Sequence, residues 1–274
     1  MSKKDNKIKY IAPMGMIIII LSLAIYFLWQ ENMRYKEVIK NKDIEISRIQ
    51  DKDDFQEELN KSIEERDHLL AISEDLTKKI EELQNKANIE REYGLVKLSD
   101  IDPTFVEDLR YATENNFVKK QIYPDNSIAI LRTDTAMKLK EANEIFQKDG
   151  YTIKIFDAYR PHSAQYILWD YASDKNFVAD PKKGSKHNMG VAVDITLVDK
   201  EGNEIEMGTE YDNFTEKAAY NYSGHTETAL KNMKYLRDVM EQVGFKGISN
   251  EWWHFDDIDW KQYEVLDIGF DEFV

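Results

Sequence analysis

The stretch 31–93 contains neither proline nor glycine, and this constrains the fold of the chain more than any other feature. Both residues disfavour a helix interior, so their absence over such a length favours one long helix. Leu69, Leu76 and Leu83 repeat every seven residues, as in a coiled-coil seam, although the register slips before this block. We expect residues 31–93 to form a helical coiled-coil stalk of roughly 90 Å, with a surface for homo-oligomerisation. A lone solvated helix rich in ion pairs is the alternative.

The segment before the stalk has no charged residue from Tyr10 to Gln30, and its centre is almost entirely aliphatic. About 20 apolar residues span a bilayer as a helix, and Tyr10 and Trp29 stand where interfacial aromatic side chains are favoured. A cleaved signal peptide is the alternative, but the apolar run is longer than a typical signal core and no small-x-small cleavage site follows it. We therefore expect a transmembrane anchor at 10–30 after a tail of residues 1–9.

The basic residues around this span bear on its orientation in the membrane. Lys3, Lys4, Lys7 and Lys9 precede the span, and Arg34, Lys36, Lys40 and Lys42 follow it. The positive-inside count is thus nearly balanced. Because a short tail before a first span usually stays in the cytoplasm, we expect a single-pass protein of the cell membrane whose C-terminal domain is extracytoplasmic.

The net charge and the absence of cysteine exclude several classes of function. Lys and Arg total 37 against 52 Asp and Glu, a formal net charge of −15, whereas nucleic-acid binding normally needs a basic face. We therefore expect no nucleic-acid partner. Without cysteine the chain has no disulfide, no thiolate zinc ligand and no thiol nucleophile. Any metal must be held by Asp, Glu or one of the five histidines: His68, His162, His187, His225 and His254.

Residues 94–274 differ in composition from the stalk, because aromatic residues, glycine and proline appear and β-rich runs alternate with amphipathic patterns. A segment of this size is ordinary for one domain. We expect an α+β fold with a central, mainly antiparallel sheet flanked by helices. Strands are expected at 151–156 and 191–198, and helices at about 134–148, 161–173 and 226–242.

Two short stretches of this domain carry side chains suited to chemistry. The first, Ser185-Lys-His-Asn-Met-Gly-Val-Ala-Val-Asp194, puts His187 on a loop and Asp194 inside an otherwise apolar strand. A carboxylate there is costly unless it is paired or binds a cation. The second, Glu251-Trp-Trp-His254, places an acid and an imidazole three residues apart. Residues three apart face opposite sides of a strand, so we expect Glu251 at the entrance of a strand or on a bulge.

Two histidines and one carboxylate make an ordinary three-ligand catalytic zinc site, with the fourth position left for water. His187, Asp194 and His254 provide this set, and Glu251 is a second carboxylate that can take a proton from the water. Taken singly, these residues decide nothing, because a buried histidine is more often a core residue than a ligand and an aspartate on a strand can cap a turn. The spacing alone leaves both interpretations open.

Five ordered motifs change this balance. They are Tyr-Ala-Thr-x-x-Asn-Phe at 111–117, Asp-Ala-Tyr-Arg-Pro at 157–161, Ser-x-His-x-x-Gly-x-Ala-x-Asp at 185–194, Met-Gly-x-x-Tyr-Asp-x-Phe at 207–214 and Glu-x-Trp-His at 251–254. Together they resemble the zinc D,D-peptidases of bacterial cell-wall metabolism, and most closely the D-alanyl-D-alanine dipeptidases associated with vancomycin resistance. The similarity covers roughly residues 97–260 and nothing before them.

The resemblance implies a role for each matching residue of this chain. His187, Asp194 and His254 would hold one Zn²⁺, and Glu251 would be the general base. The implied reaction is hydrolysis of a short D,D-peptide, in which Glu251 takes a proton from water and passes it to the leaving D-alanine.

Four further residues match positions of the family around the substrate. Arg160 corresponds to an arginine near the scissile carbonyl, where a guanidinium can stabilise an oxyanion; a structural ion pair with Asp157 is the alternative. Ser185 matches a serine that contacts the C-terminal carboxylate of the substrate. Tyr111 and Asp212 match positions near its free amino group, where an acid selects for an ammonium and thereby for a dipeptide.

The implied substrate is the D-Ala-D-Ala dipeptide. A D,D-carboxypeptidase that trims terminal D-Ala from peptidoglycan stem peptides is the alternative, and the anchor and stalk favour it, because an extracytoplasmic domain would face finished wall. A wall-binding scaffold without activity is a third interpretation. Such a protein usually loses a ligand or the base, whereas all four of these residues are present here.

Overall fold

A computed structural model describes residues 3–49 and 56–273, and it describes the side chains of residues 19–48 and 56–273. The chain divides into two compact units, Met1–Glu92 and Tyr93–Val274.

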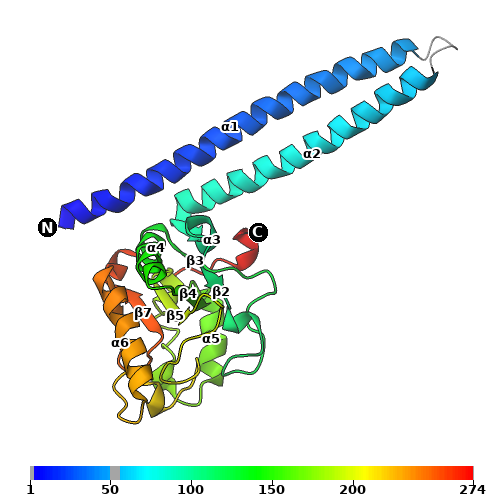
Figure 1. Ribbon diagram of the computed structural model, residues 1–274. Coiled ribbons are helices and arrows are strands. Elements are labelled where there is room, and N and C mark those ends of the chain that lie inside the picture. Colours follow the sequence, from blue (N-terminus) through cyan, green and yellow to red (C-terminus); the bar gives the residue numbers. More distant parts are fainter. Residues whose placement is uncertain (1–2, 50–55, 274) are drawn as a thin grey trace. The chain divides into compact units, whose positions relative to one another are not determined.

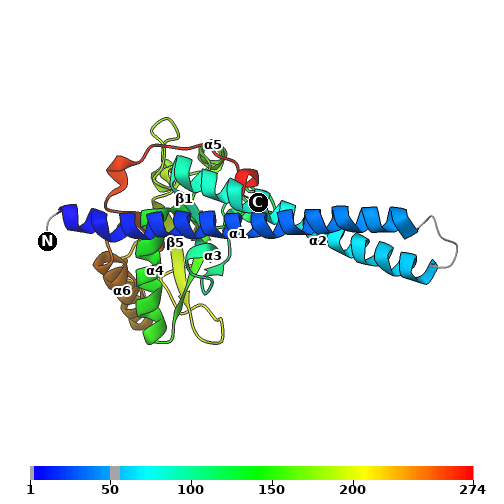
Figure 2. The same cartoon turned by 90° about the horizontal axis from the view of Figure 1, so that it is seen from above.

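The N-terminal unit consists of two long helices, α1 (Lys3–Ile49) and α2 (Gln56–Tyr93), which run beside each other in both views (Figure 1, Figure 2). Their direction is antiparallel, because Asn32 of α1 contacts Ser73 and Thr77 of α2, whereas Lys42 further along α1 contacts Glu65, which comes earlier in α2. Asn32 Nδ2 donates to Thr77 Oγ1 (3.0 Å), Ser73 Oγ donates to Asn32 Oδ1 (2.6 Å), and Lys42 Nζ lies 3.2 Å from Glu65 Oε2.

This hairpin corrects the prediction of one continuous stalk helix over 31–93. Ile39 and Ile46 of α1 and Ile80 of α2 are buried in it, so part of the apolar seam expected to pair with another chain is covered within the same chain. Pairing two segments of one chain costs less entropy than joining two molecules, which favours the internal pairing. The seven-residue repeat is confirmed as a helix signal. Homo-oligomerisation through the stalk stays a prediction.

No helix in the described part of the chain is long and apolar enough to cross a membrane. The predicted anchor at 10–30 falls partly outside that part, because the side chains of residues 1–18 are not described. Anchoring and the extracytoplasmic location therefore stay predictions.

The C-terminal unit is built on a five-stranded sheet with the order β2-β4-β5-β7-β6 (Figure 1). The pair β2–β4 is parallel and the other three pairs are antiparallel, as expected for a mainly antiparallel α+β domain. A separate antiparallel pair joins β1 to β3. The strands are β1 (Leu95–Lys97), β2 (Val106–Glu107), β3 (Ile130–Arg132), β4 (Thr152–Asp157), β5 (Ala192–Val198), β6 (Phe245–Gly247) and β7 (His254–Asp257).

The helices predicted at 134–148, 161–173 and 226–242 are confirmed to within two residues at each end, and the short helix Leu98–Ile101 was not predicted. Thr226 starts one of them, because its Oγ1 accepts a hydrogen bond from Ala229 N (3.0 Å) and so satisfies a backbone donor of the first turn. The helices are α3 (Leu98–Ile101), α4 (Thr133–Lys148), α5 (His162–Tyr171) and α6 (Glu227–Gln242).

The core lies between the sheet and helices α4 and α6. The residues of β5 that face this core determine which way Asp194 points. Val193, Ile195 and Leu197 of β5 belong to one apolar cluster with residues such as Leu139 of α4. Because side chains alternate across a strand, Asp194 extends from the opposite face of the sheet. The same alternation that builds the core therefore turns one acid away from it.

The hairpin can be tested with cysteines, because the natural chain has none. A double variant Asn32→Cys, Ser73→Cys should form a disulfide within one chain under mild oxidation, since these side chains touch across the hairpin (2.6 Å). Non-reducing electrophoresis checks this, and the expected product runs as a monomer. A control pair, Asn32→Cys with Glu57→Cys at the start of α2, should stay reduced. Efficient dimer formation by the first variant would contradict the hairpin and support a stalk between two chains.

Candidate active site

Asp194 and His254 lie directly opposite each other on the neighbouring antiparallel strands β5 and β7. Opposite residues of such a pair project to the same face, with Cβ atoms about 5 Å apart. His254 Nδ1 lies 2.8 Å from Asp194 Oδ1. The strand register alone thus brings together two groups that are sixty residues apart in the chain.

His187 reaches the same point from a short 3₁₀ turn, His187–Met189, that precedes β5. Gly190 ends this turn with a φ of 71°, and a Cβ at that position would lie 2.9 Å from a methyl carbon of Leu95. Only glycine takes this left-handed conformation and this close approach without strain. The turn holds the imidazole above the start of β5, as the sequence predicted for a loop entering a strand.

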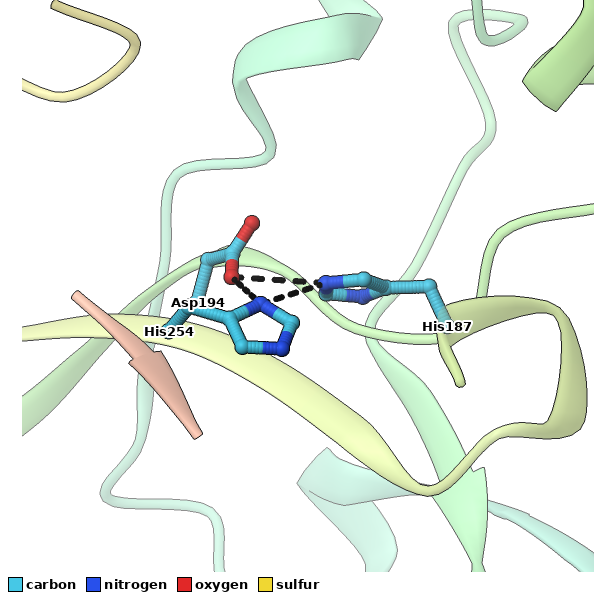
Figure 3. Close-up of side chains that lie close together, drawn as sticks. All are labelled: His187, Asp194 and His254. Carbon is cyan, nitrogen blue, oxygen red and sulfur yellow. Dashed lines mark hydrogen bonds and ion pairs between the residues drawn. The ribbon is translucent and has the colours of Figure 1, made fainter. Parts of the chain in front are cut away.

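The three predicted metal ligands converge (Figure 3). His187 Nε2 lies 3.3 Å from Asp194 Oδ1 and 3.2 Å from His254 Nδ1, so the three donor atoms form a nearly regular triangle with the 2.8 Å contact of Asp194 and His254. Ligand atoms of a tetrahedral zinc, each about 2.0–2.2 Å from the ion, are roughly 3.3–3.6 Å apart. The donor set and its spacing therefore fit Zn²⁺ after small outward shifts.

The donors are held in place by their surroundings. Tyr211 OH donates to the second oxygen of Asp194 (3.0 Å), and His187 Nδ1 lies 2.7 Å from the carbonyl oxygen of Ala158. Burial raises the pKa of Asp194, but the adjacent His187 and His254 outweigh it and hold that pKa well below its usual range. Asp194 is therefore ionised and available as a ligand at neutral pH.

Glu251 lies three residues before β7 begins, at the entrance of the strand, as predicted. Its side chain is buried and lines the same cavity as the three ligands. Burial raises the pKa of Glu251 to about 8; His254 opposes this shift, and the negative charges of Asp194 and Asp212 add to it. The site thus contains a second carboxyl group that exchanges a proton near neutral pH.

Arg160 forms the ion pair that was the structural alternative for it, and it also lines the cavity. Its Nε and Nη2 donate to Asp157 Oδ2 (3.0 and 2.6 Å), and its Nη1 donates to Gln165 Oε1 (2.7 Å). Tyr123 OH donates to the other oxygen of Asp157 (2.8 Å). The two interpretations are therefore compatible, because the ion pair fixes the direction in which the guanidinium points.

Tyr111 and Asp212 meet at another wall of the cavity. Tyr111 OH donates to Asp212 Oδ1 (3.2 Å), and the backbone N–H of Phe117 donates to Oδ2 (3.2 Å). Asp212 has a φ of 59°, a left-handed conformation that aspartate tolerates better than most residues. Burial raises its pKa to about 7; the hydrogen bond from Phe117 opposes this, and the charge of Asp194 adds to it.

The cavity has a volume of about 600 Å³, within the usual range for small-molecule sites. It is lined by all eight residues predicted for catalysis, substrate binding and metal binding: Tyr111, Arg160, Ser185, His187, Asp194, Asp212, Glu251 and His254. The two other histidines of this unit bond to backbone carbonyl groups instead, His162 to Pro181 and His225 to Ala219.

The sequence did not single out several residues that support the site. Gln165 and Tyr211 hold Arg160 and Asp194, and Asp256 Oδ1 lies 2.9 Å from His254 Nε2. Tyr211 and Asp256 lie inside or next to the motifs at 207–214 and 251–254, which was the available signal. Gln165 stands on a helix with no motif of its own.

The comparisons with known proteins agree with this geometry. The family model described as D-Ala-D-Ala dipeptidase matches residues 91–271. The D-alanyl-D-alanine dipeptidase of Escherichia coli K12 is 36% identical over 180 residues, which cover 66% of this chain and 93% of that protein. The enzyme of the same name from Enterococcus faecium is 29% identical over 185 residues, covering 60% and 91%.

A solved zinc complex of a mutant of the vancomycin-resistance D,D-pentapeptidase VanY is 18% identical, with a TM-score of 0.33 and coverage of 49% of this chain and 76% of that one. The family assignment rests on the sequence matches, since the family model covers well over half of the chain. The resemblance inferred from the five motifs is thereby confirmed. The chain belongs to the D-Ala-D-Ala dipeptidase family of peptidases.

Proposed function

We propose that this chain hydrolyses the dipeptide D-Ala-D-Ala with the help of one zinc ion held by His187, Asp194 and His254. The observation that carries the proposal is the triangle of three donor atoms, 2.8–3.3 Å apart, in the wall of a cavity that also contains Glu251 and Arg160. Zinc supplies a Lewis acid that polarises the peptide carbonyl and lowers the pKa of water towards 7.

Glu251 acts as the general base in this proposal. Burial raises the pKa of Glu251 to about 8, and a cation at the three donors would favour its ionised form, so the carboxylate can take a proton from water and return it. The oxygen of water bonds to the carbonyl carbon as Glu251 accepts the proton. The carbon–nitrogen bond then breaks, and Glu251 delivers the proton to the amine of the leaving D-alanine.

Arg160 stabilises the negative charge that develops on the carbonyl oxygen. A guanidinium has five N–H groups, and three of them are donated to Asp157 and Gln165. The two remaining N–H groups are on the terminal nitrogens, and the side chain lines the cavity. A donor fixed before the reaction is effective because it need not reorganise as the charge forms.

Asp212 recognises the free amino group of the dipeptide, with Tyr111 holding one of its oxygens. An ammonium favours the charged form of this carboxyl, whereas an acylated amine of a longer peptide offers no charge to it. Ser185, which also lines the cavity, is assigned to the C-terminal carboxylate of the substrate. Selection for a dipeptide would therefore come from an acid that is costly to bury without a cation.

We further propose that residues 10–30 anchor the protein in the cell membrane with the C-terminal domain outside the cytoplasm. The uncharged run supports this, as do the exposed side chains at its described end, where apolar groups face solvent rather than α2. These side chains are Ile19, Ile20, Leu23, Tyr26 and Phe27, with exposures of 52–65%.

Replacing Glu251 by Gln should lower kcat by roughly 10²- to 10⁴-fold, the usual contribution of general acid–base catalysis. The zinc content should stay at one ion per chain, because Glu251 is not among the converging donors. Release of D-alanine and elemental analysis of the purified protein check the two expectations. Glu210→Gln, at an exposed position, is the control. Loss of zinc from the Glu251 variant would identify this residue as a ligand instead.

Replacing Asp212 by Asn should lower kcat/KM for D-Ala-D-Ala by about 10- to 100-fold, since a hydrogen bond to a charged group contributes about 1.5–3 kcal/mol. Asparagine also tolerates the left-handed φ of 59°. The same substitution should hardly change the slow cleavage of N-acetyl-D-Ala-D-Ala. A wild-type enzyme that prefers the acetylated substrate would instead support the D,D-carboxypeptidase alternative.

Membrane orientation can be tested by adding an impermeant protease to intact cells. The C-terminal domain should be cleaved in intact cells, and a cytoplasmic marker protein should be cleaved only after lysis. Protection of the domain until lysis would place it in the cytoplasm, where dipeptide and cell-wall precursors rather than finished wall are its substrates.

A further inference from the structure

We infer that Asp256 is a positioning residue for the zinc site: it fixes the imidazole of His254 so that Nδ1, and not Nε2, faces the metal. Lys186 in turn holds Asp256. The inference rests on the proposed zinc site, and it adds a side chain that is not among the three converging donors.

The two nitrogens of His254 face different partners. Nδ1 lies 2.8 Å from Asp194 Oδ1 and 3.2 Å from His187 Nε2, among the donor atoms. Nε2 lies 2.9 Å from Asp256 Oδ1, away from them. The side chain of Asp256 is only 10% exposed, so little water competes for this contact.

A carboxylate oxygen accepts hydrogen bonds and donates none, so the contact with Asp256 requires a proton on Nε2. A neutral imidazole has only one N–H, and a metal binds the nitrogen that lacks it. Nδ1 also contacts a carboxylate oxygen, that of Asp194, so a metal at the three donors would take the place of a proton on Nδ1 while Asp256 keeps the proton on Nε2. Without Asp256 the ring has no acceptor at Nε2, and the tautomer with Nδ1–H, which cannot bind zinc through that atom, becomes accessible.

Lys186 restrains Asp256 from the other side. Its Nζ lies 2.6 Å from Asp256 Oδ2, and it also lies over the Trp260 ring, 5.1 Å from the ring centre, in a cation–π contact. Lys186 is the neighbour of His187 in the chain, so this ion pair ties the turn that carries one ligand to the strand that carries another. Each carboxylate oxygen of Asp256 thus has one fixed partner.

The strand itself provides a matched control. His254 and Asp256 are two residues apart on β7 and share a face, whereas Asp257 points to the other face. There Asp257 accepts from Thr135 Oγ1 (2.8 Å) and contacts Lys138 Nζ (2.5 Å). Asp256 and Asp257 are both buried and both paired with a lysine, but only Asp256 contacts a metal ligand.

The experiment measures zinc affinity, by competition with a chelator, for the purified full-length chain in detergent. Asp256→Ala should weaken zinc binding by about 10- to 100-fold, the usual effect of removing a partner of a ligating histidine. Asp256→Asn should weaken it by about threefold to tenfold, because the amide oxygen still accepts from Nε2–H but carries no charge. Asp257→Asn should lower the melting temperature and leave the zinc affinity unchanged.

Each outcome decides between interpretations. Wild-type affinity in Asp256→Ala overturns the inference, and so does an equal loss in Asp257→Asn, which would mean that any damage to β7 releases the metal. If Asp256→Ala does not fold, Asp256→Asn decides alone, and an unchanged affinity in it overturns the inference. A wild-type chain that binds no zinc would instead refute the proposed metal site.

Discussion

The register between β5 and β7 is the constraint on which the site depends. Asp194 and His254 are paired across these strands, so every other part of the centre is arranged around a point fixed by backbone hydrogen bonds. A slip of one residue would turn Asp194 into the apolar core and an apolar neighbour into the cavity. The alternation of Val193, Asp194 and Ile195 makes such a slip costly, because it would bury the carboxylate among side chains that cannot pair with it.

The buried charges around the three donor atoms favour a bound cation. Asp194, Asp212 and Glu251 are all carboxyl groups in the wall of the cavity, and the positive charge of Arg160 is largely matched by Asp157. Without a further cation, burial and mutual repulsion raise the pKa of Asp212 to about 7 and that of Glu251 to about 8. A divalent ion at the three donors favours the charged forms of both groups, so metal binding and the ionisation of the proposed base and of the proposed ammonium site promote each other.

The sequence singled out the residues that line the cavity, but it did not single out the residues that hold them in place. The five motifs contain the three donors, Glu251 and Arg160, which line one cavity, and each lies in a short pattern with few alternatives. The contact between Asp256 and His254 depends on which nitrogen faces the strand, and no pattern of residue types contains that information. The role of Gln165 was not predicted either. Its partner Arg160 lies five residues earlier, on the loop before the helix that carries Gln165, and the sequence does not show that the two side chains meet. The prediction of one continuous stalk helix was wrong for a different reason. A seven-residue repeat specifies a helix with an apolar seam, but it does not specify whether the partner of that seam is another chain or the next helix.

The hairpin restricts how an anchor at 10–30 can be used. Pairing of Asn32 with Ser73 and Thr77, and of Lys42 with Glu65, sets an antiparallel register in which the described end of the apolar run, 19–30, faces the later turns of α2. Those turns carry Lys78, Lys79, Glu81 and Glu82, which are too costly to place in the hydrocarbon of a bilayer. If residues 19–30 insert into a bilayer, this part of α1 must therefore separate from α2. The contacts of Asn32 with Ser73 and Thr77 are then the first ones beyond residue 30 that can stay formed. Insertion of residues 19–30 into a bilayer and closure of the whole hairpin would therefore exclude each other, because the charged turns of α2 cannot follow the apolar run into the hydrocarbon.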